Sequence, residues 1–500
     1  MKNAGLSKKS GILTTTILAS GMGFFITTAV LIALPPIQKT FQANMTQIQW
    51  IGNSYELALA TFILFSGVVS DRYGLTKVFN AGILIFTISS LLIGISMSLD
   101  MVIIFRILQG FGAALMIPGS LTIISKHFHT AERGKAIGLW AGLSGAFSAL
   151  GPLAGGVLAD FSWRLVFLIM VPAGIITLVM SKKYLSDAPS CTNAGIKWTS
   201  ASLAFLCIFP LVFGLTRISD YGFDAIVIAC LLFECLIMPA FIYHELRTDS
   251  PLIPIRSFSR NVKLANLSTA LLYFSFTGAL FLLSFYLQQF QAYSASLAGL
   301  AILPITLCIA FFSGFSGSMT DRVGPRLQMA LGPFLFTLGC ILIAIGANGI
   351  NYFLFLFPGI MLIGIGMTVV IPALTKTALD VNESIYGTAS SVNNAMAKAG
   401  GMLAIAVLGT LMTLSFTNNL EKLLIESGLS TAHISSVLAQ TKNMMIVDIP
   451  YTLPEIEGLV RQAYSKAFIT GMLVNASLSF GCVIISFFLA SHAIIRNAEK

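Results

Sequence analysis

Long runs of apolar residues, separated by short polar segments, make up most of the chain. About 20 consecutive apolar residues are needed to cross the hydrocarbon core of a bilayer as a helix. Fourteen runs have about that length, at approximately 12–34, 48–70, 78–98, 100–124, 136–159, 163–181, 197–216, 223–243, 264–289, 297–319, 328–347, 352–376, 388–415 and 470–491. The pattern predicts an all-α polytopic membrane protein with fourteen transmembrane helices.

The composition excludes a soluble globular protein. Hydrophobic residues make up 56% of the chain and charged residues only 10%, against roughly 25% charged residues in a soluble domain. The mean hydropathy is +0.87. The first run follows three lysines, as in a signal peptide, but it is longer than a signal's apolar region and more runs follow it. We therefore expect it to be retained as the first transmembrane helix.

The basic residues predict the orientation in the membrane. The net charge is +9, and Lys and Arg are spread over short loops, which argues against binding to nucleic acid. Most of them fall in the loops on the side of the N-terminus. Because cytoplasmic loops carry the excess of Lys and Arg, both termini are expected to be cytoplasmic, in the cell inner membrane.

A loop motif occurs twice, 250 positions apart, each time between two apolar runs. A single copy is compatible with any polar turn between membrane helices, but the repeat implies two related halves. Its glycines allow close helix approach and the positive φ of a tight turn. The residues of this predicted conformational motif are Gly67, Asp71, Arg72, Gly74 and Lys77 in the first copy and Gly317, Asp321, Arg322, Gly324 and Arg326 in the second.

The motif follows the second run of each half, which predicts the domain organisation. Residues 1–185 form one six-helix bundle, 263–500 form the other, and 186–262 contribute two inserted helices with cytoplasmic linkers. The largest segment outside the membrane is 416–469, where apolar residues recur at helical spacing around Leu420 and Val437 and where Pro454 is expected to open a third short helix. A capping loop on the membrane surface is favoured over a partner-binding role.

Four charged residues interrupt apolar runs: Glu56, Arg106, Glu234 and Lys398. Each costs about 2.5–3.5 kcal/mol at a helix centre. From the helical rise, Glu56 lies about 12 Å and Arg106 about 9 Å from the outer ends of their helices. We expect the two to pair, either for proton coupling or as a structural ion pair. For Glu234, in the inserted helices, a structural contact is favoured.

Two further runs carry unusual residues. Lys398 follows Ser390, Ser391, Asn393 and Asn394 in the thirteenth run, which favours a cavity-lining role over a plain helix contact. The fifth run contains several small residues and a proline, which suit either close helix packing or a hinge or gate. They are Gly145, Gly151, Pro152, Gly155 and Gly156.

No enzyme site is predicted. The five His residues lie in loops or at run ends without a consistent Ser or Cys partner, and Gly-rich stretches lie within apolar runs rather than after a strand. The seven Cys residues show neither metal-ligand spacing nor a disulfide framework. We expect no catalysis, no cofactor and no metal.

The chain resembles the major facilitator superfamily over nearly its whole length, specifically the fourteen-span drug:proton antiporter family. The loop motif is similar to the family's loop after span two, Arg106-Ile-Leu-Gln109-Gly110 to its span-four motif, and Gly151-Pro152-Leu-Ala-Gly155-Gly156 to the span-five motif of exporters. Further similar positions are Trp163, Arg164, Phe167, Pro172, Tyr286, Gln288, Gln289, Tyr293, Ser294, Ala298, Gly299, Gly387, Ala389, Ser390, Asn393 and Asn394.

The resemblance implies two six-helix bundles that rock about a central cavity by alternating access. It implies that Arg106 helps proton coupling and that the span-five glycines seal the bundle interface. Cavity candidates are Gln109, Gln288, Gln289, Asn393, Asn394 and Lys398.

One position departs from the family. An acidic residue is usual a few residues before Ala33-Leu34-Pro35, but Ile26 stands there. Glu56 has the same estimated depth of about 12 Å. We hypothesise that Glu56 has taken over the carboxylate role.

The sequence thus predicts a proton-coupled antiporter that exports small organic compounds or drugs. We expect it to be a monomer in the lipid bilayer and to bind protons and its small-molecule substrate. Two alternatives stay open: a dedicated metabolite or siderophore exporter or uptake permease, and a non-transporting receptor or scaffold.

Overall fold

The computed structural model describes residues 2–128, 130–185, 198–248, 251, 253, 255–348, 352–382, 385–441 and 454–489. The helices of the first half are α1 (Lys2–Phe41), α2 (Met45–Tyr73), α3 (Leu75–Gly94), α4 (Leu99–His127), α5 (Thr130–Phe161), α6 (Trp163–Leu168) and α7 (Met170–Tyr184). They are followed by α8 (Trp198–Tyr221) and α9 (Ala225–Arg247), and then by α10 (Arg260–Phe285), the π-helix η1 (Tyr286–Phe290), α11 (Ala295–Val323), α12 (Pro325–Ile345), the 3-10 turn η2 (Gly346–Asn348), α13 (Leu356–Ala378), α14 (Tyr386–Glu426), α15 (Thr431–Thr441) and α16 (Pro454–Phe487).

The predicted all-α polytopic membrane class is confirmed, but the count of fourteen spans is not. Within the described residues, twelve helices are long and apolar enough to cross a membrane. The apolar part of α8, Ser202–Ile218, is shorter than the others. Helix α2 has 29 residues but is not among the twelve, because Gln47, Gln49, Asn53 and Glu56 lower the hydropathy of its described part.

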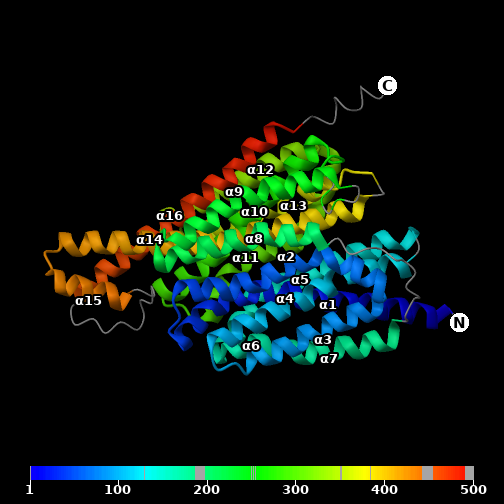
Figure 1. The fold of residues 1–500 in the computed structure, drawn as a ribbon, viewed down its shortest axis with the longest axis horizontal. Helices are drawn as coiled ribbons and strands as arrows, with labels where there is room; N and C mark the ends of the chain where they lie inside the picture. The colour runs from blue at the N-terminus through cyan, green and yellow to red at the C-terminus, as the bar shows by residue number, and fades with distance from the viewer. Residues whose placement is uncertain are drawn as a thin grey trace.

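The helices gather in two groups. In the first, α1 packs on α5 and α4 packs on α2 and α3; in the second, α10 packs on α14, and α12 packs on α13 and α16. Helices α5 and α2 contact α11 and α14, respectively, and so join the two groups. Figure 1 shows the long helices running side by side along the longest axis of the molecule, with α15 at one end and the start of α1 at the other.

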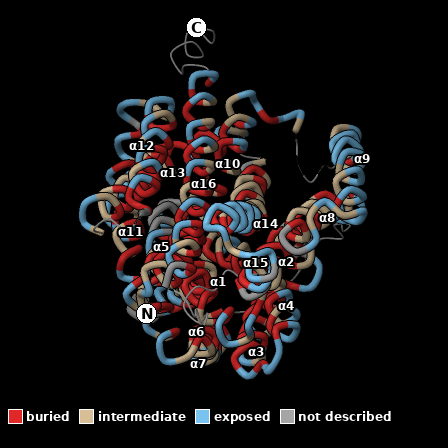
Figure 2. The backbone as a smooth tube through the Cα atoms, turned by 90° about the vertical axis from the view of Figure 1, so that its left-hand side faces the viewer, coloured by how far each residue is buried: buried red, intermediate tan, exposed pale blue. Residues whose placement is uncertain are grey.

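Helices α8 and α9 lie at the edge of this assembly. Helix α8 contacts α2 and α14, whereas α9 packs mainly on α8. Figure 2 shows α9 as a largely exposed helix at the periphery, and only 11% of its most apolar window is buried. Exposed apolar side chains on a membrane-spanning helix face lipid. This arrangement fits two helices added beside a bundle.

The repeated loop motif forms the predicted turn in both copies. Gly74 has φ +97° between α2 and α3, and Gly324 has φ +85° between α11 and α12. The amide of Gly74 donates to the Ser70 carbonyl, and that of Gly324 donates to the Thr320 carbonyl. Positive φ is unstrained only for glycine, so these glycines allow each helix pair to reverse direction within one residue.

In segment 416–469 the structure differs from the prediction at Pro454, which begins a long helix rather than a third short one. The first part of the segment continues α14 to Glu426, and Pro454 begins α16, which runs without interruption into the last span. Proline is tolerated in the first turn of a helix and does not require a separate short helix. Phe416 of α14 packs edge-on against Tyr464 of α16. Buried contacts of this kind explain why both helices extend beyond the predicted spans.

Candidate functional site

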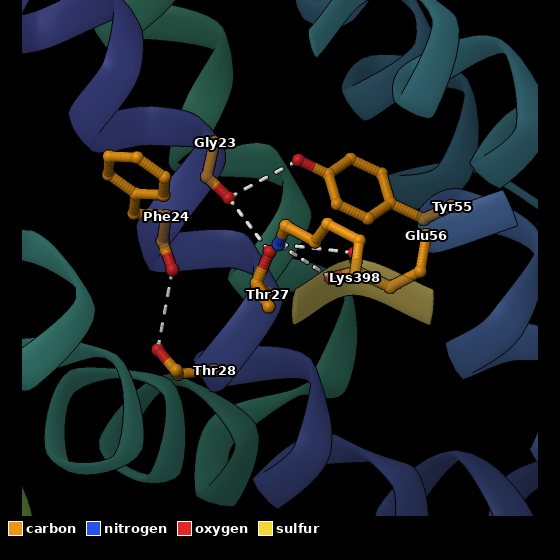
Figure 3. A network of polar contacts seen from close by, with 7 residues as sticks. All are labelled: Gly23, Phe24, Thr27, Thr28, Tyr55, Glu56 and Lys398. Carbon is orange, nitrogen blue, oxygen red and sulfur yellow. Dashed lines mark hydrogen bonds and ion pairs between the residues drawn. The ribbon is translucent and has the colours of Figure 1, made fainter. Parts of the chain in front are cut away.

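An ion pair joins the two helix groups near the middle of α2. The Lys398 ammonium of α14 lies 3.1 Å from Glu56 Oε2 and donates to Glu56 Oε1 at 3.2 Å. The exposed fractions of the two side chains are 21% and 10%. Figure 3 shows the lysine side chain reaching to the carboxylate beside α1. Removing one member of a buried ion pair destabilises the protein, because the remaining charge stays desolvated without its partner.

The predicted pairing of Glu56 with Arg106 is not formed. Arg106 is 1% exposed; its Nε donates to the Ile51 carbonyl at 3.1 Å and its NH1 donates to Gln109 Oε1 at 2.8 Å. The guanidinium also lies 4.3 Å from the centre of the Tyr55 ring. Ile51 and Tyr55 share one face of α2, turned toward α4, whereas Glu56 is turned toward α14. The similar depths estimated from the helical rise therefore did not predict the pairing.

The position opposite Glu56 on α1 carries no acid. The Tyr55 hydroxyl donates to the Gly23 carbonyl at 3.2 Å, and Thr27 donates to the same carbonyl at 3.0 Å (Figure 3). The first bond joins α2 to α1, and the second lies within α1. Ile26, at the departed position, is fully buried.

Small residues of α5 let it approach α1. A methyl group on Gly151 would collide with the Thr28 side chain, and one on Gly155 would meet Ala29 at 2.7 Å. Around Gly145, in contrast, no atom lies within 4 Å of an added methyl group. Close packing therefore accounts for Gly151 and Gly155, but it does not account for Gly145.

The end of α5 contacts α11 of the other helix group. A methyl group on Gly156 would collide with the Ala295 carbonyl, and one on Gly299 would collide with the Pro152 carbonyl. Asp160 accepts a hydrogen bond from the Ala295 amide at 2.7 Å. A carboxylate at a helix N-terminus is favourable because it meets unpaired amides and the positive end of the dipole. The two groups are therefore in tight backbone contact here.

The π-helix η1 adds a second contact between the two helix groups, this time with α1. Gln288 donates to the Ile32 carbonyl at 2.9 Å and Gln289 donates to Gln38 Oε1 at 2.6 Å. These glutamines, predicted as cavity residues, lie in the contact between α1 and η1. Together with the α5–α11 contact they close the end of the molecule that carries the α1–α2 loop, which we name the α1–α2 end. The opposite end, which carries Gly74, is named the α2–α3 end.

Hollows occur toward the α2–α3 end. An open surface hollow of about 590 Å³ at the end of α13 is lined by Pro372, Thr375, Lys376, Leu379 and Asp380. A recess of about 110 Å³ shares Thr375 and Leu379 with it and is lined by residues of α10, α13 and α14, including Asn393 and Asn394. The predicted cavity residue Gln109 lies elsewhere, fully buried beside Arg106. Lys398 is on the same helix as Asn393 and Asn394 but is not among the residues that line the recess.

Sequence reasoning missed a buried polar stripe on α2. Gln49 and Asn53 are fully buried, and Gln49 donates to the Ala406 carbonyl of α14 at 3.3 Å. Both polar atoms of the Asn53 side chain, and Gln49 Oε1, have no hydrogen-bond partner. The spacing of Gln49, Asn53 and Glu56 at i, i+4 and i+7 places them on one helix face. This spacing of polar residues was the sequence signal that could have predicted the stripe.

The remaining predicted residues are placed as follows. Arg326 donates to the Phe487 carbonyl at 3.0 Å, and the Arg72 guanidinium lies 5.6 Å from the Tyr73 ring centre. Both carboxylate oxygens of Glu234 on α9 are shielded and have no hydrogen-bond partner. Lys77 lies in the first turn of α3, Gly317 lies in α11, and Arg322 lies in its last turn. The side chains of Gly67, Asp71 and Asp321 lie outside the described part of the chain.

Comparisons with known proteins identify the relatives of this chain. A family model described as Major Facilitator Superfamily matches residues 15–405. The tetracenomycin C resistance and export protein of Streptomyces glaucescens is 32% identical over 412 residues, covering 79% of this chain and 75% of that protein. Multidrug resistance protein Stp of Mycobacterium tuberculosis is 28% identical, covering 81% and 77%. The methylenomycin A resistance protein of Bacillus subtilis is 26% identical, covering 83% and 92%.

Solved structures share the fold. A bacterial homologue of the human lysosomal transporter Spinster superposes with a TM-score of 0.68 at 16% identity, covering 96% of this chain and 98% of that one. The xylose transporter of E. coli gives 0.61 at 11% identity, covering 97% and 98%. These likenesses confirm the predicted major facilitator fold.

Proposed function

The chain belongs to the Major Facilitator Superfamily, and from this premise we propose that it exports small organic drugs in exchange for protons by alternating access. Its relatives carry names of resistance and export proteins, and it is a multi-pass membrane protein. The family and the fold point to a transporter rather than to an enzyme, a receptor or a scaffold. The runner-up is a dedicated exporter of one metabolite.

The observation that carries the proposal is the ion pair between Glu56 and Lys398. It joins α2 to α14 across the two helix groups. Protonation of Glu56 removes the negative charge and leaves the ammonium without its partner. The attraction between the groups then weakens, which favours opening of the α1–α2 end. Proton binding is thereby coupled to a change in which end of the protein is open.

Arg106 acts in this proposal as a positioning residue. Its bond to the Ile51 carbonyl ties α4 to α2 one turn before Glu56, and its bond to Gln109 within α4 holds the guanidinium in place. Because the guanidinium is held by a backbone carbonyl and an amide, it fixes the height and rotation of α2. We propose that it supports proton coupling by holding Glu56 toward α14 rather than by pairing with it.

The orientation follows from the basic loops. With both termini in the cytoplasm, the α2–α3 end faces inward and the α1–α2 end faces outward, in the inner membrane of a bacterial cell. The hollows at the α2–α3 end then open to the cytoplasm, as an exporter requires for loading. We also propose that the protein is a monomer. Its two six-helix bundles then comprise residues 1–185 and 263–500, and the inserted helix pair comprises residues 186–262.

The test is proton release driven by substrate in inverted membrane vesicles. Wild type is compared with Glu56→Gln over a panel of lipophilic cations, anionic and neutral aromatic compounds. We expect one compound class to drive proton movement in wild type and none to do so in the variant. The matched control is Glu426→Gln, which removes an exposed carboxylate paired with Lys422 within α14. Transport that is independent of the pH gradient, or unchanged in Glu56→Gln, would overturn the proposal.

A further inference from the structure

The polar stripe on α2 connects the closed α1–α2 end with the ion pair. Gln49 lies in the second turn of α2, and Glu56 follows seven residues later, about 10 Å further along the helix axis. Gln49 donates to the Ala406 carbonyl of α14, and Glu56 pairs with Lys398 of the same helix. Both ends of the stripe therefore contact α14, and Asn53 lies between them.

The first two residues of the stripe carry polar atoms that the protein leaves unsatisfied. Asn53 is fully buried, and among the described residues neither its amide nitrogen nor its oxygen has a hydrogen-bond partner; the same holds for Gln49 Oε1. An unsatisfied buried polar group costs about 1–3 kcal/mol. Buried water in proteins makes about three hydrogen bonds to groups of this kind. The two amides thus supply the donors and acceptors that ordered water requires.

Glycines on both helices let α2 and α14 approach with a polar side chain between them. A methyl group on Gly409 of α14 would collide with the Gln49 amide, and one on Gly52 of α2 would meet Ile405 of α14 at 3.0 Å. A larger residue at position 409 would displace the amide from the contact. The contact between the two helix groups is therefore shaped to accommodate Gln49.

Helix α8 covers the contact between α2 and α14 from the side. The Thr46 hydroxyl of α2 donates to the Thr216 carbonyl of α8 at 3.2 Å, and the Thr410 hydroxyl of α14 donates to the Leu215 carbonyl of α8 at 2.8 Å. The three helices also share an apolar cluster, whose buried members are Leu57, Ala60, Val212, Met402 and Ala406. One of the inserted helices thus separates this seam from the lipid.

The titratable groups around Glu56 lie on two sides of it. Lys398 of α14 faces it directly, and Arg106 of α4 lies against Tyr55 on the neighbouring face of α2. Helix α1 presents Thr27 (Figure 3), and the side chains of α8 that pack on this part of α2 are apolar. Arginine does not release its proton, and the Tyr55 hydroxyl is bound to a carbonyl of α1. Neither group therefore relays protons to Glu56 from the α1–α2 end.

We propose that Gln49 and Asn53 hold water that carries protons from the α1–α2 side to Glu56 while that end is closed. This inference rests on the proposed function, in which protonation of Glu56 opens the α1–α2 end. The proton gradient drives that opening only if the proton comes from the outer side. The water beside Glu56 gives one proton to the carboxylate and takes another from the water at Gln49, so each water is left unchanged. The amides do not titrate; they fix the position of the water.

The experiment follows protonation of Glu56 in the full-length protein and needs no transported substrate. A cross-link between Asp160→Cys and Ala295→Cys holds the α1–α2 end closed in every sample, so the variants cannot act by shifting the balance between states. The protein is reconstituted in vesicles with this end outward, and the outer pH is lowered in one step. Time-resolved infrared spectroscopy records the protonated carboxyl band of Glu56, which is identified by its loss in Glu56→Gln.

We expect Gln49→Met and Asn53→Leu each to slow the rise of the band at least tenfold, which corresponds to about 1.4 kcal/mol of barrier. The final amplitude should be unchanged, which also shows that the variants are folded. Asn53→Ser should keep the wild-type rate, because a hydroxyl both donates and accepts. The matched control is Asn419→Leu, which makes the same change at an amide of α14 that bonds the Ser415 carbonyl of its own helix.

The outcomes separate this inference from the proposed function. Equal rates in wild type, Gln49→Met and Asn53→Leu would overturn the water route alone. Slowing in Asn53→Leu that persists in Asn53→Ser would also overturn it, because packing of α2 would then set the rate. Faster protonation after a pH step on the α2–α3 side would place the route at the other end. If Glu56→Gln removed no band, Glu56 would not titrate, and both the proposed function and this inference would fail.

Discussion

Lys398 and Glu56 lie 342 positions apart in the sequence, yet the ammonium of one is 3.1 Å from the carboxylate of the other. Helices α2 and α14 come from the two helix groups, so this pair is a contact between the groups and not within one of them. Because the pair spans the two groups, a change in the charge of Glu56 acts on both of them.

Removal of Lys398 alone should destabilise the protein. In Lys398→Gln, Glu56 keeps its charge in a site where its side chain is only 10% exposed, and breaking a buried pair from one side costs about 3–5 kcal/mol. The double variant Glu56→Gln/Lys398→Gln should recover most of that loss, because no charge stays unpaired. Thermal unfolding of the purified protein in detergent measures both. Additive effects of the two substitutions would show that the residues are not energetically coupled.

Asn53 should limit the stability of the state closed at the α1–α2 end. Both polar atoms of its side chain are buried without a partner, and an unsatisfied buried polar group costs about 1–3 kcal/mol. Asn53→Leu should therefore raise the unfolding temperature and slow transport, because the closed state is favoured over the open one. Asn419→Leu is the control, since that amide already bonds the Ser415 carbonyl of its own helix. A variant that is both less stable and equally fast would contradict the assignment.

The helices and the glycine turns could be predicted from sequence, whereas the partner of Glu56 could not. Apolar run length and the Gly74 and Gly324 motif are local properties: the two glycine turns formed as predicted, and within the described residues twelve helices are long and apolar enough to cross a membrane. The partner of Glu56 depends on which face of α2 meets which helix. An estimate of depth alone does not distinguish Arg106 on α4 from Lys398 on α14.

The ends of α14 and α16 were missed for a related reason. Composition marks where a helix leaves the hydrocarbon core, but not where it stops. The buried contact of Phe416 with Tyr464 joins two segments that are distant in sequence. Contacts of that kind extend both helices beyond the predicted spans.

Replacing Arg106 by lysine should impair proton exchange, although the positive charge is kept. The guanidinium donates from two nitrogens to Ile51 and Gln109 at once, and a lysine ammonium cannot reproduce that fixed geometry. Arg106→Lys should lower the rate of proton exchange at least tenfold, which corresponds to about 1.4 kcal/mol. The vesicle assay of proton release measures this. Arg247→Lys, an exposed residue in the last turn of the peripheral helix α9, is the control, and equal rates in both variants would contradict a positioning role.

Gly156 and Gly145 provide a matched pair on one helix. Gly156→Ala would drive a methyl group into the Ala295 carbonyl of α11, whereas Gly145→Ala meets no atom within 4 Å. Overpacking of a tight contact costs about 1–3 kcal/mol, and because this contact joins the two groups, the cost falls on the state closed at the α1–α2 end. Gly156→Ala should therefore shift the population toward opening at that end. Gly145→Ala should leave that population unchanged and should stabilise the helix by roughly 0.5–1 kcal/mol.

The shift is measured as the distance between spin labels at the ends of α5 and α11. A longer distance in Gly156→Ala and an unchanged one in Gly145→Ala is the expected result. If both variants kept the wild-type distance, the α5–α11 contact would be plain packing that both states share. If Gly145→Ala also lengthened the distance, bending of α5 at Gly145 would control opening, and the glycines that follow it would be secondary to that hinge.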